Sequence, residues 1–209
     1  MQRTLNKERR WLEVQDTVSR ISDTQGKPVD AGIAKALTGL LAYSFPTEGS
    51  CEGHLDYGVK APWIDVGKNL PARYIALFKR KGLPHKPGRP PHVDDVFAAY
   101  PALWELRTSN MRLLRRLRAL LRAFYRTHQS FVPDAELVIV EQGCYGMVRL
   151  ISHGADYQDT RTFQQQAEYL RFYQQEMQTF AEFLKKRYFQ ATSRPRIYES
   201  TALLLSAIA

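Results

Sequence analysis

Two short stretches rich in β-branched and aliphatic residues, separated by three residues, constrain the fold most strongly. Residues 136–141 read Glu-Leu-Val-Ile-Val-Glu, and residues 145–151 read Tyr-Gly-Met-Val-Arg-Leu-Ile. This composition is typical of strands, and the intervening Gln-Gly-Cys predicts that the two strands pair as an antiparallel hairpin. A second, looser hairpin is predicted from residues 47–51 and 62–66, whose connection contains two glycines.

Helical periodicity fills the sequence around both hairpins. The chain reads as two helices, a hairpin, a long helix over 107–126, a second hairpin and a long helix over 160–189. This order predicts an α+β fold, in which one antiparallel four-stranded sheet, built from two hairpins, is covered by long α-helices on one face. A length of 209 residues suits a single domain. We therefore predict one domain over residues 1–209, with a basic, proline-rich loop at 79–92.

The sequence lacks the apolar segments of an exported or membrane protein. Apolar runs such as residues 202–205 are far too short to span a membrane, and the first residues contain no apolar export signal. We therefore expect a cytoplasmic protein that does not enter a membrane. In that reducing environment Cys51 and Cys144 are expected to remain thiols.

The densest group of reactive side chains lies in Ser50-Cys51-Glu52-Gly53-His54-Leu55-Asp56, followed by Pro62-Trp63-Ile64-Asp65-Val66. Its candidate catalytic residues are Cys51, His54, Asp56 and Asp65. Polar groups gathered in a loop at a strand end are typical of functional sites. One chemistry open to them is a Cys51 thiolate nucleophile activated by His54.

Two other chemistries use the same segment. Metal ligation would combine Cys51 and His54 with Asp56 or His153, but one Cys-x-x-His pair is a weak metal signal, so the sequence assigns no metal. The leading hypothesis is instead a small polar ligand or nucleotide, with the ligand-binding candidates Glu52, Trp63, Arg149 and His153. The sequence leaves the cofactor unknown. A purely structural role, with Cys51 buried and His54 bonded to backbone, stays open.

A second hypothesis comes from the charge. The net charge of +9 is concentrated in residues 79–92, 107–126 and 185–196. Guanidinium groups match phosphate geometry, which indicates a nucleic-acid-binding surface made of Lys79, Arg80, Lys81, Arg115, Arg118, Arg122 and Arg126. The alternative is a solvated basic face balanced by glutamates of the last helix, namely Glu168, Glu176 and Glu182.

A third hypothesis is an oligomeric interaction protein. Leu170, Met177 and Leu184 recur every seven residues in the last predicted helix. That spacing is typical of a helical seam between chains.

The loop segment also resembles a motif pair of small uncharacterised bacterial proteins, in which a helix precedes an SCEGHxD loop that is followed by PWIDV. The resemblance covers about residues 30–67 and implies a bacterial origin, without a function. A fainter similarity is to the tRNA wybutosine-synthesis methyltransferase family, through Ser50, Cys51, Gly53 and His54. It implies methyl transfer, but the S-adenosylmethionine site of that family has no visible counterpart in this sequence.

Overall fold

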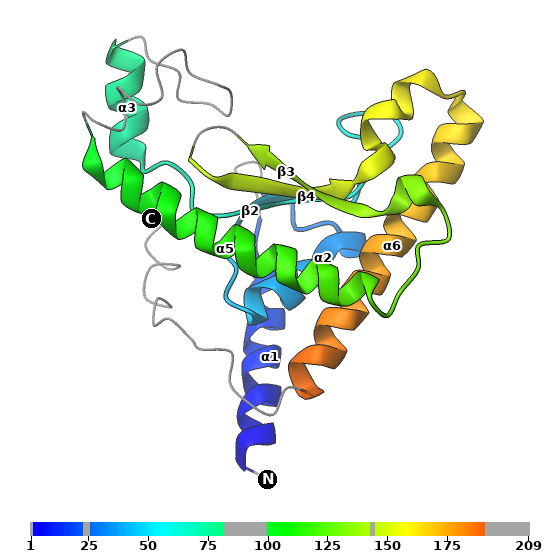
Figure 1. Ribbon diagram of the computed structural model, residues 1–209, viewed down its shortest axis with the longest axis horizontal. Coiled ribbons are helices and arrows are strands. Elements are labelled where there is room, and N and C mark those ends of the chain that lie inside the picture. Colours follow the sequence, from blue (N-terminus) through cyan, green and yellow to red (C-terminus); the bar gives the residue numbers. More distant parts are fainter. Residues whose placement is uncertain (1, 23–25, 82–99, 143–144, 191–209) are drawn as a thin grey trace.

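The computed structural model describes residues 2–22, 26–81, 100–142 and 145–190 (Figure 1). The α-helices are α1 (Gln2–Arg20), α2 (Ala31–Ala42), α3 (Ala72–Lys81), α5 (Pro101–Tyr125) and α6 (Phe163–Gln190). The strands are β1 (Thr47–Cys51), β2 (Trp63–Val66), β3 (Leu137–Gln142) and β4 (Met147–Ser152). Two 3-10 helices, η1 (Pro133–Ala135) and η2 (His153–Thr160), flank the second hairpin.

The four strands form one antiparallel sheet in the order β1-β2-β4-β3. Each hairpin supplies one inner and one outer strand, and the two hairpins meet where β2 pairs with β4. At this seam Ile64 lies opposite Leu150, and Asp65 lies opposite Arg149. The predicted α+β fold with a four-stranded antiparallel sheet from two hairpins is therefore confirmed.

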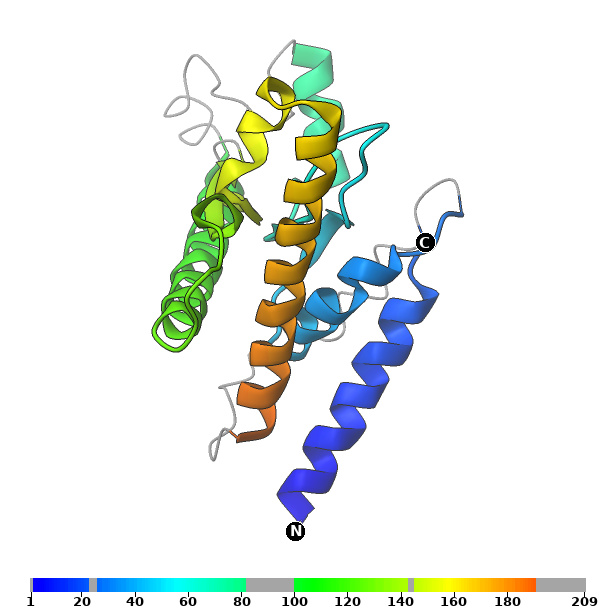
Figure 2. The ribbon, with the colours of Figure 1, turned by 90° about the vertical axis from the view of Figure 1, so that its right-hand side faces the viewer.

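The main core lies on one face of this sheet. Alternate residues of the inner strands, such as Ile64 and Leu150, are fully buried there. They pack in one cluster with side chains of α2, α5 and α6, including Leu40, Leu117 and Phe180. Figures 1 and 2 show α2 and α5 on the same side of the sheet, with α6 running beside them. The predicted helical cover of one face is present.

A smaller core closes one end of the sheet. Ile151 points away from the main core and packs with Ala61 and Tyr173, and the Tyr173 side chain is fully buried. Since Tyr173 belongs to the N-terminal half of α6, this helix contributes to both cores.

Two expectations need correction. The basic loop was expected to begin at Lys79, but α3 continues to Lys81, because lysine and arginine extend a helix readily and the first proline comes only at Pro84. The rest of the predicted loop, residues 82–92, and the side chains of Lys79 and Lys81 lie outside the described part of the chain.

The second correction concerns the proposed oligomer seam. Leu170, Met177 and Leu184 are 7%, 1% and 0% exposed and pack inside their own chain. The seven-residue spacing thus serves the core of the domain, and these side chains are not available to a second chain. None of the helices in the described ranges is long and apolar enough to cross a lipid bilayer.

Candidate functional site

Two reciprocal hydrogen bonds attach the Cys51–Asp65 loop to the start of α2. The Glu52 carboxylate accepts from the Gly32 backbone N–H at 2.7 Å, and the Glu52 backbone N–H donates to Asp30 Oδ2 at 3.3 Å. Asp30 precedes α2 but makes no side-chain cap bond. A glutamate from another part of the chain therefore satisfies one free N–H of this helix, and the Asp30 carboxylate is left facing the loop.

Gly53 shapes the turn that follows β1. Its φ of +82° lies in the left-handed region, and its N–H donates to Cys51 Sγ at 3.3 Å. A Cβ atom here would lie 2.7 Å from the Ala61 carbonyl carbon. Only glycine combines this backbone angle with so close a contact, and the resulting turn brings Cys51 and His54 to the same side.

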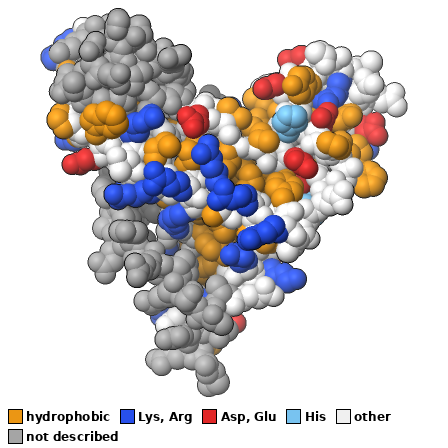
Figure 3. Space-filling model, in the orientation of Figure 1, with side chains coloured by type: hydrophobic (Ala, Val, Ile, Leu, Met, Phe, Trp, Pro, Cys, Tyr) orange, Lys and Arg blue, Asp and Glu red, His pale blue; other side chains and the backbone are white. Residues whose placement is uncertain are grey.

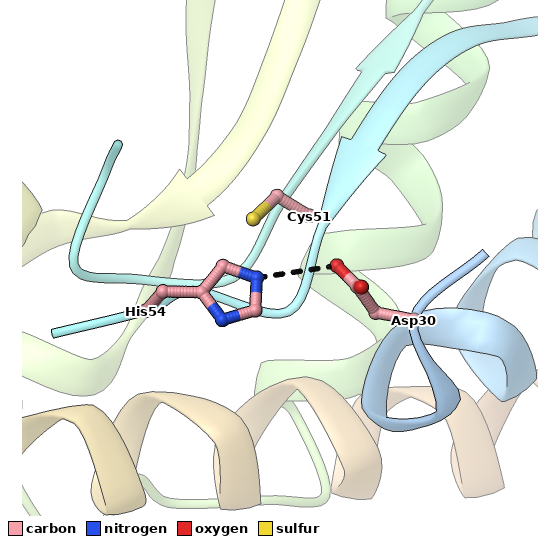
Figure 4. Close-up of side chains that lie close together, drawn as sticks. All are labelled: Asp30, Cys51 and His54. Carbon is pink, nitrogen blue, oxygen red and sulfur yellow. Dashed lines mark ion pairs between the residues drawn. The ribbon is translucent and has the colours of Figure 1, made fainter. Parts of the chain in front are cut away.

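The turn and the hydrogen bonds bring Asp30, Cys51 and His54 together (Figure 4). One donor atom from each residue lies within 4.8 Å of the other two. His54 Nε2 is 3.5 Å from Asp30 Oδ2, yet it has no partner in hydrogen-bonding geometry, although the atom is buried. This cluster, which we call the Asp30–Cys51–His54 cluster, joins two of the predicted catalytic residues to one that was not predicted.

Burial and neighbouring groups shift the pKa values of two members of the cluster. Burial raises the pKa of the Cys51 thiol, and the neighbouring Asp30 carboxylate adds to the effect. Burial would also raise the pKa of Asp30, but the Glu52 N–H and the Lys27 ammonium, 3.2 Å from Oδ1, together hold it below its usual value. The cluster thus contains a protonated thiol beside a carboxylate.

This arrangement differs from a nucleophile with its base and orienting acid. Such a relay needs the two ring nitrogens of the histidine to face the thiol and the carboxylate separately. In Figure 4 the nitrogen joined to Asp30 is also the one nearer Cys51, and the other nitrogen points away. A thiol with a raised pKa is also a poor nucleophile. The geometry favours convergence of three donors on one point.

Two further predicted residues are bonded to each other. Arg149 donates to both carboxylate oxygens of Asp65, at 2.7 and 2.8 Å, and its guanidinium lies 3.9 Å from the centre of the Trp63 ring. Asp65, a predicted catalytic residue, therefore lies beside Arg149 and Trp63, two predicted ligand-binding residues. Such a meeting is expected when the two hairpins are neighbours in one sheet. The polar atoms of Asp65 and Arg149 are directed at one another, and the Trp63 face is covered by a guanidinium.

The remaining predicted residues are separated from the cluster. Asp56 and His153 are exposed, and neither belongs to the group of converging donors, where Asp30 stands in the place proposed for them. The Glu52 carboxylate is bonded to Gly32. Asp30 could be located in the sequence only as the residue preceding a helix, since nothing there shows that its side chain turns away from the helix.

A second candidate site covers the outer side of α5. The exposed arginines there are Arg112, Arg115, Arg118 and Arg122, together with Arg126 at the C-cap of the helix. Figure 3 shows Lys and Arg side chains gathered in a band over this helix. We call these five residues the α5 arginine row. Arg80 of α3 is exposed too, while Arg116 is not part of the row, because it donates to the Tyr43 carbonyl at 2.6 Å.

The glutamates expected to balance this charge behave differently. Glu176 is buried and accepts from Tyr125 Oη at 2.9 Å, with His128 Nε2 also at 2.9 Å, so the expectation that it balances the surface charge is wrong. Glu182 pairs with Lys35 of α2 at 3.4 Å. Within the described chain, the ion pair found for the row joins Arg118 to Glu141 at 3.7 Å.

A groove of about 370 Å³ lies elsewhere, between α1, α2 and α6. Its walls include Trp11, Val29 and Lys185, and it contains none of the predicted site residues.

Comparisons of this chain with models of known protein families, with curated proteins and with solved structures found no match. The function must be inferred from the two candidate sites themselves.

Proposed function

We propose that this protein binds nucleic acid through the α5 arginine row. The observation that carries the proposal is that five exposed arginines, four on α5 and one at its C-cap, lie on one side of this helix, while the opposite side of the helix is buried. A phosphate backbone is the polyanion whose charges are spaced along a line, as these guanidinium groups are.

The spacing along the helix supports a linear partner. Arg115, Arg118, Arg122 and Arg126 recur at three- and four-residue intervals, so each guanidinium is one helical turn from the next. From Arg112 to Arg126 the row extends about 21 Å at 1.5 Å per residue. Several phosphates of one strand fit within this length.

An aromatic residue extends the same side of the helix. Trp104 is 48% exposed and precedes Arg115 by eleven residues, which is about three turns. It therefore lies in line with Arg115 and Arg122. Proteins that bind single-stranded nucleic acids combine aromatic rings, on which bases stack, with positive charges, which pair with phosphates.

Little negative charge opposes the row. Its pairing with Glu141, at 3.7 Å, joins two half-exposed side chains and is weak. The net charge of +9 adds a field that attracts a polyanion from a distance.

The test is the salt dependence of binding to a fluorescently labelled single-stranded RNA or DNA, followed by anisotropy. We expect log Kobs to fall linearly with log salt, with a slope of about −0.7 per phosphate contacted for a single strand. A variant with Arg115→Gln, Arg118→Gln and Arg122→Gln should bind at least tenfold more weakly in low salt, with a slope smaller in magnitude by about two.

The matched control removes the same charge from α6, with Arg171→Gln, Lys185→Gln and Lys186→Gln, all exposed. It should retain most of the affinity and the slope. Absence of binding in low salt, or an equal loss in both triple variants, would overturn the proposal, since the second result would mean that net charge alone attracts the nucleic acid.

A further inference from the structure

His54 Nε2 is a buried donor or acceptor with no hydrogen-bond partner among the described residues. Burial of such an atom without a partner costs about 1–3 kcal/mol, so its position needs an explanation. It faces the Asp30 carboxylate and the Cys51 sulfur, both of which carry free lone pairs. When the thiol and the imidazole are deprotonated, the lone pairs of these three atoms converge on one point, where a cation would give all of them a partner.

We infer that Asp30, Cys51 and His54 bind a zinc ion. This function is separate from the proposed binding of nucleic acid and would stand without it. Sulfur, imidazole nitrogen and carboxylate oxygen are the three donor types that zinc accepts in proteins. A thiolate and a carboxylate together carry two negative charges, so the loaded site would be electrically neutral, as a half-buried site requires.

The distances suit this ion. Bond lengths of about 2.0–2.3 Å around a tetrahedral centre place neighbouring donors about 3.3–3.7 Å apart. Asp30 Oδ2 and His54 Nε2 are already 3.5 Å apart, and the sulfur lies within 4.8 Å of both. A shift of at most about 1 Å in the Cys51 side chain therefore completes the set.

Surrounding groups hold two of the three ligands in place. The Tyr57 ring stacks on His54 with centroids 4.3 Å apart. Lys27 pairs with Asp30 Oδ1, and the Glu52 N–H donates to Oδ2, so the carboxylate is held with Oδ2 toward the cluster and with a lone pair remaining for the metal. Such outer contacts orient metal ligands and tune their affinity. The Lys27 ammonium also contacts Tyr57 Oη at 3.3 Å. It therefore contacts both the Asp30 carboxylate and the ring that stacks on His54.

Three protein ligands leave a fourth tetrahedral position for water or another small ligand. Structural zinc sites use four protein ligands, whereas sites with three are those at which zinc activates water or polarises a bound group. The class of ligand expected in the fourth position is therefore a water molecule or a small anion.

The experiment uses the full chain in a Cys144→Ser background, where Cys51 is the only thiol. After removal of metal with a chelator, the protein is titrated with Co²⁺ and then with Zn²⁺. We expect one equivalent of Co²⁺ to give the intense thiolate-to-cobalt charge-transfer absorption, and Zn²⁺ to abolish it by displacement. Cys51→Ser should remove the absorption, and Asp30→Asn should weaken binding at least tenfold.

Asp56→Asn and His153→Asn are the matched controls, because both residues are exposed and neither lies in the cluster. Both should bind Co²⁺ like the parent. The inference is overturned if the folded parent protein gives no charge-transfer absorption at one equivalent, or if either control variant loses binding as Cys51→Ser does. The parent measurement decides the question even if a ligand variant fails to fold.

Discussion

Arg149 and Asp65 form a bidentate ion pair across the seam at which the two hairpins meet. Both hydrogen bonds are short, 2.7 and 2.8 Å, and the two side chains are only 24% and 16% exposed. The pair joins β2 to β4 at directly opposed positions. It therefore connects two halves of the sheet that are far apart in the sequence.

A double-mutant cycle should measure this connection. Asp65→Asn and Arg149→Met should each lower the free energy of unfolding, since each leaves a partly buried charge without its partner. The coupling energy should be about 1–2 kcal/mol, above that of an exposed ion pair, because the pair is bidentate and shielded from water. Methionine retains an apolar stem over Trp63. Urea unfolding of the four proteins gives the value, and a coupling near zero would mean that the pair contributes nothing to the seam.

Gly53 and Gly58 offer a comparison within one loop. Both have positive φ, +82° and +69°, but a Cβ at Gly53 would collide with the Ala61 backbone, whereas nothing lies within 4 Å of a Cβ at Gly58. Gly58→Ala should cost about 1 kcal/mol, the strain of a left-handed alanine. Gly53→Ala should cost about 2–4 kcal/mol, because the clash is added to the strain. Equal losses in chemical denaturation would show that the turn at Gly53 can move.

The sequence was sufficient for the fold because its signals are local. Runs of β-branched and aliphatic residues beside turn residues identify the second hairpin, and the spacing of Leu117 and Phe124 identifies the buried side of α5. The order of the elements predicts that the two hairpins share one sheet, but it does not predict that β2 pairs with β4. The exact partners, such as Asp65 opposite Arg149, depend on register, which local patterns do not determine.

Two of the three residues in the Asp30–Cys51–His54 cluster could be predicted, because only these two are close in the sequence. Cys51 and His54 are three residues apart and visible as a motif, whereas Asp30 joins them through hydrogen bonds between α2 and the loop. The seven-residue spacing in α6 is compatible with a seam between chains, but the structure places these residues in the core of one chain. Periodicity indicates that a face is buried and does not indicate what buries it. Leu184, for example, packs inside its own chain.

Asn110 is a structural residue that the sequence did not reveal. It is 1% exposed in the middle of α5, accepts from the Lys68 N–H at 2.7 Å, and donates to the carbonyls of Lys68 and Tyr145, both at 2.9 Å. Asn110→Ala would remove one buried hydrogen bond, to the Tyr145 carbonyl, and two partly buried ones, to the Lys68 backbone, and should cost about 2–4 kcal/mol. Thr108→Ala, on the exposed side of the same helix, should change the unfolding midpoint little. A mild effect at Asn110 would mean that water replaces the amide.

Tyr43 should make stability fall in alkaline solution. Burial raises its pKa to about 12, an effect only partly opposed by the positive charge of Arg187. The unfolded chain releases this proton near pH 10, so the folded state holds it more tightly. The stabilisation is complete below pH 10 and is lost as the pH rises to 12.

Tyr43→Phe tests this dependence directly. The Tyr43 hydroxyl is buried without a hydrogen-bond partner in the described chain, so its removal should leave stability at pH 7 unchanged or slightly raised. Between pH 10 and 12 the variant should lose about 1–2 kcal/mol less stability than the parent, after allowance for solvent screening. Tyr157→Phe, at an exposed hydroxyl, should follow the parent curve. If the Tyr43 variant also follows it, this phenol does not account for the alkaline loss, which would then come from other buried tyrosines such as Tyr173 and Tyr188, whose pKa values are raised by burial as well.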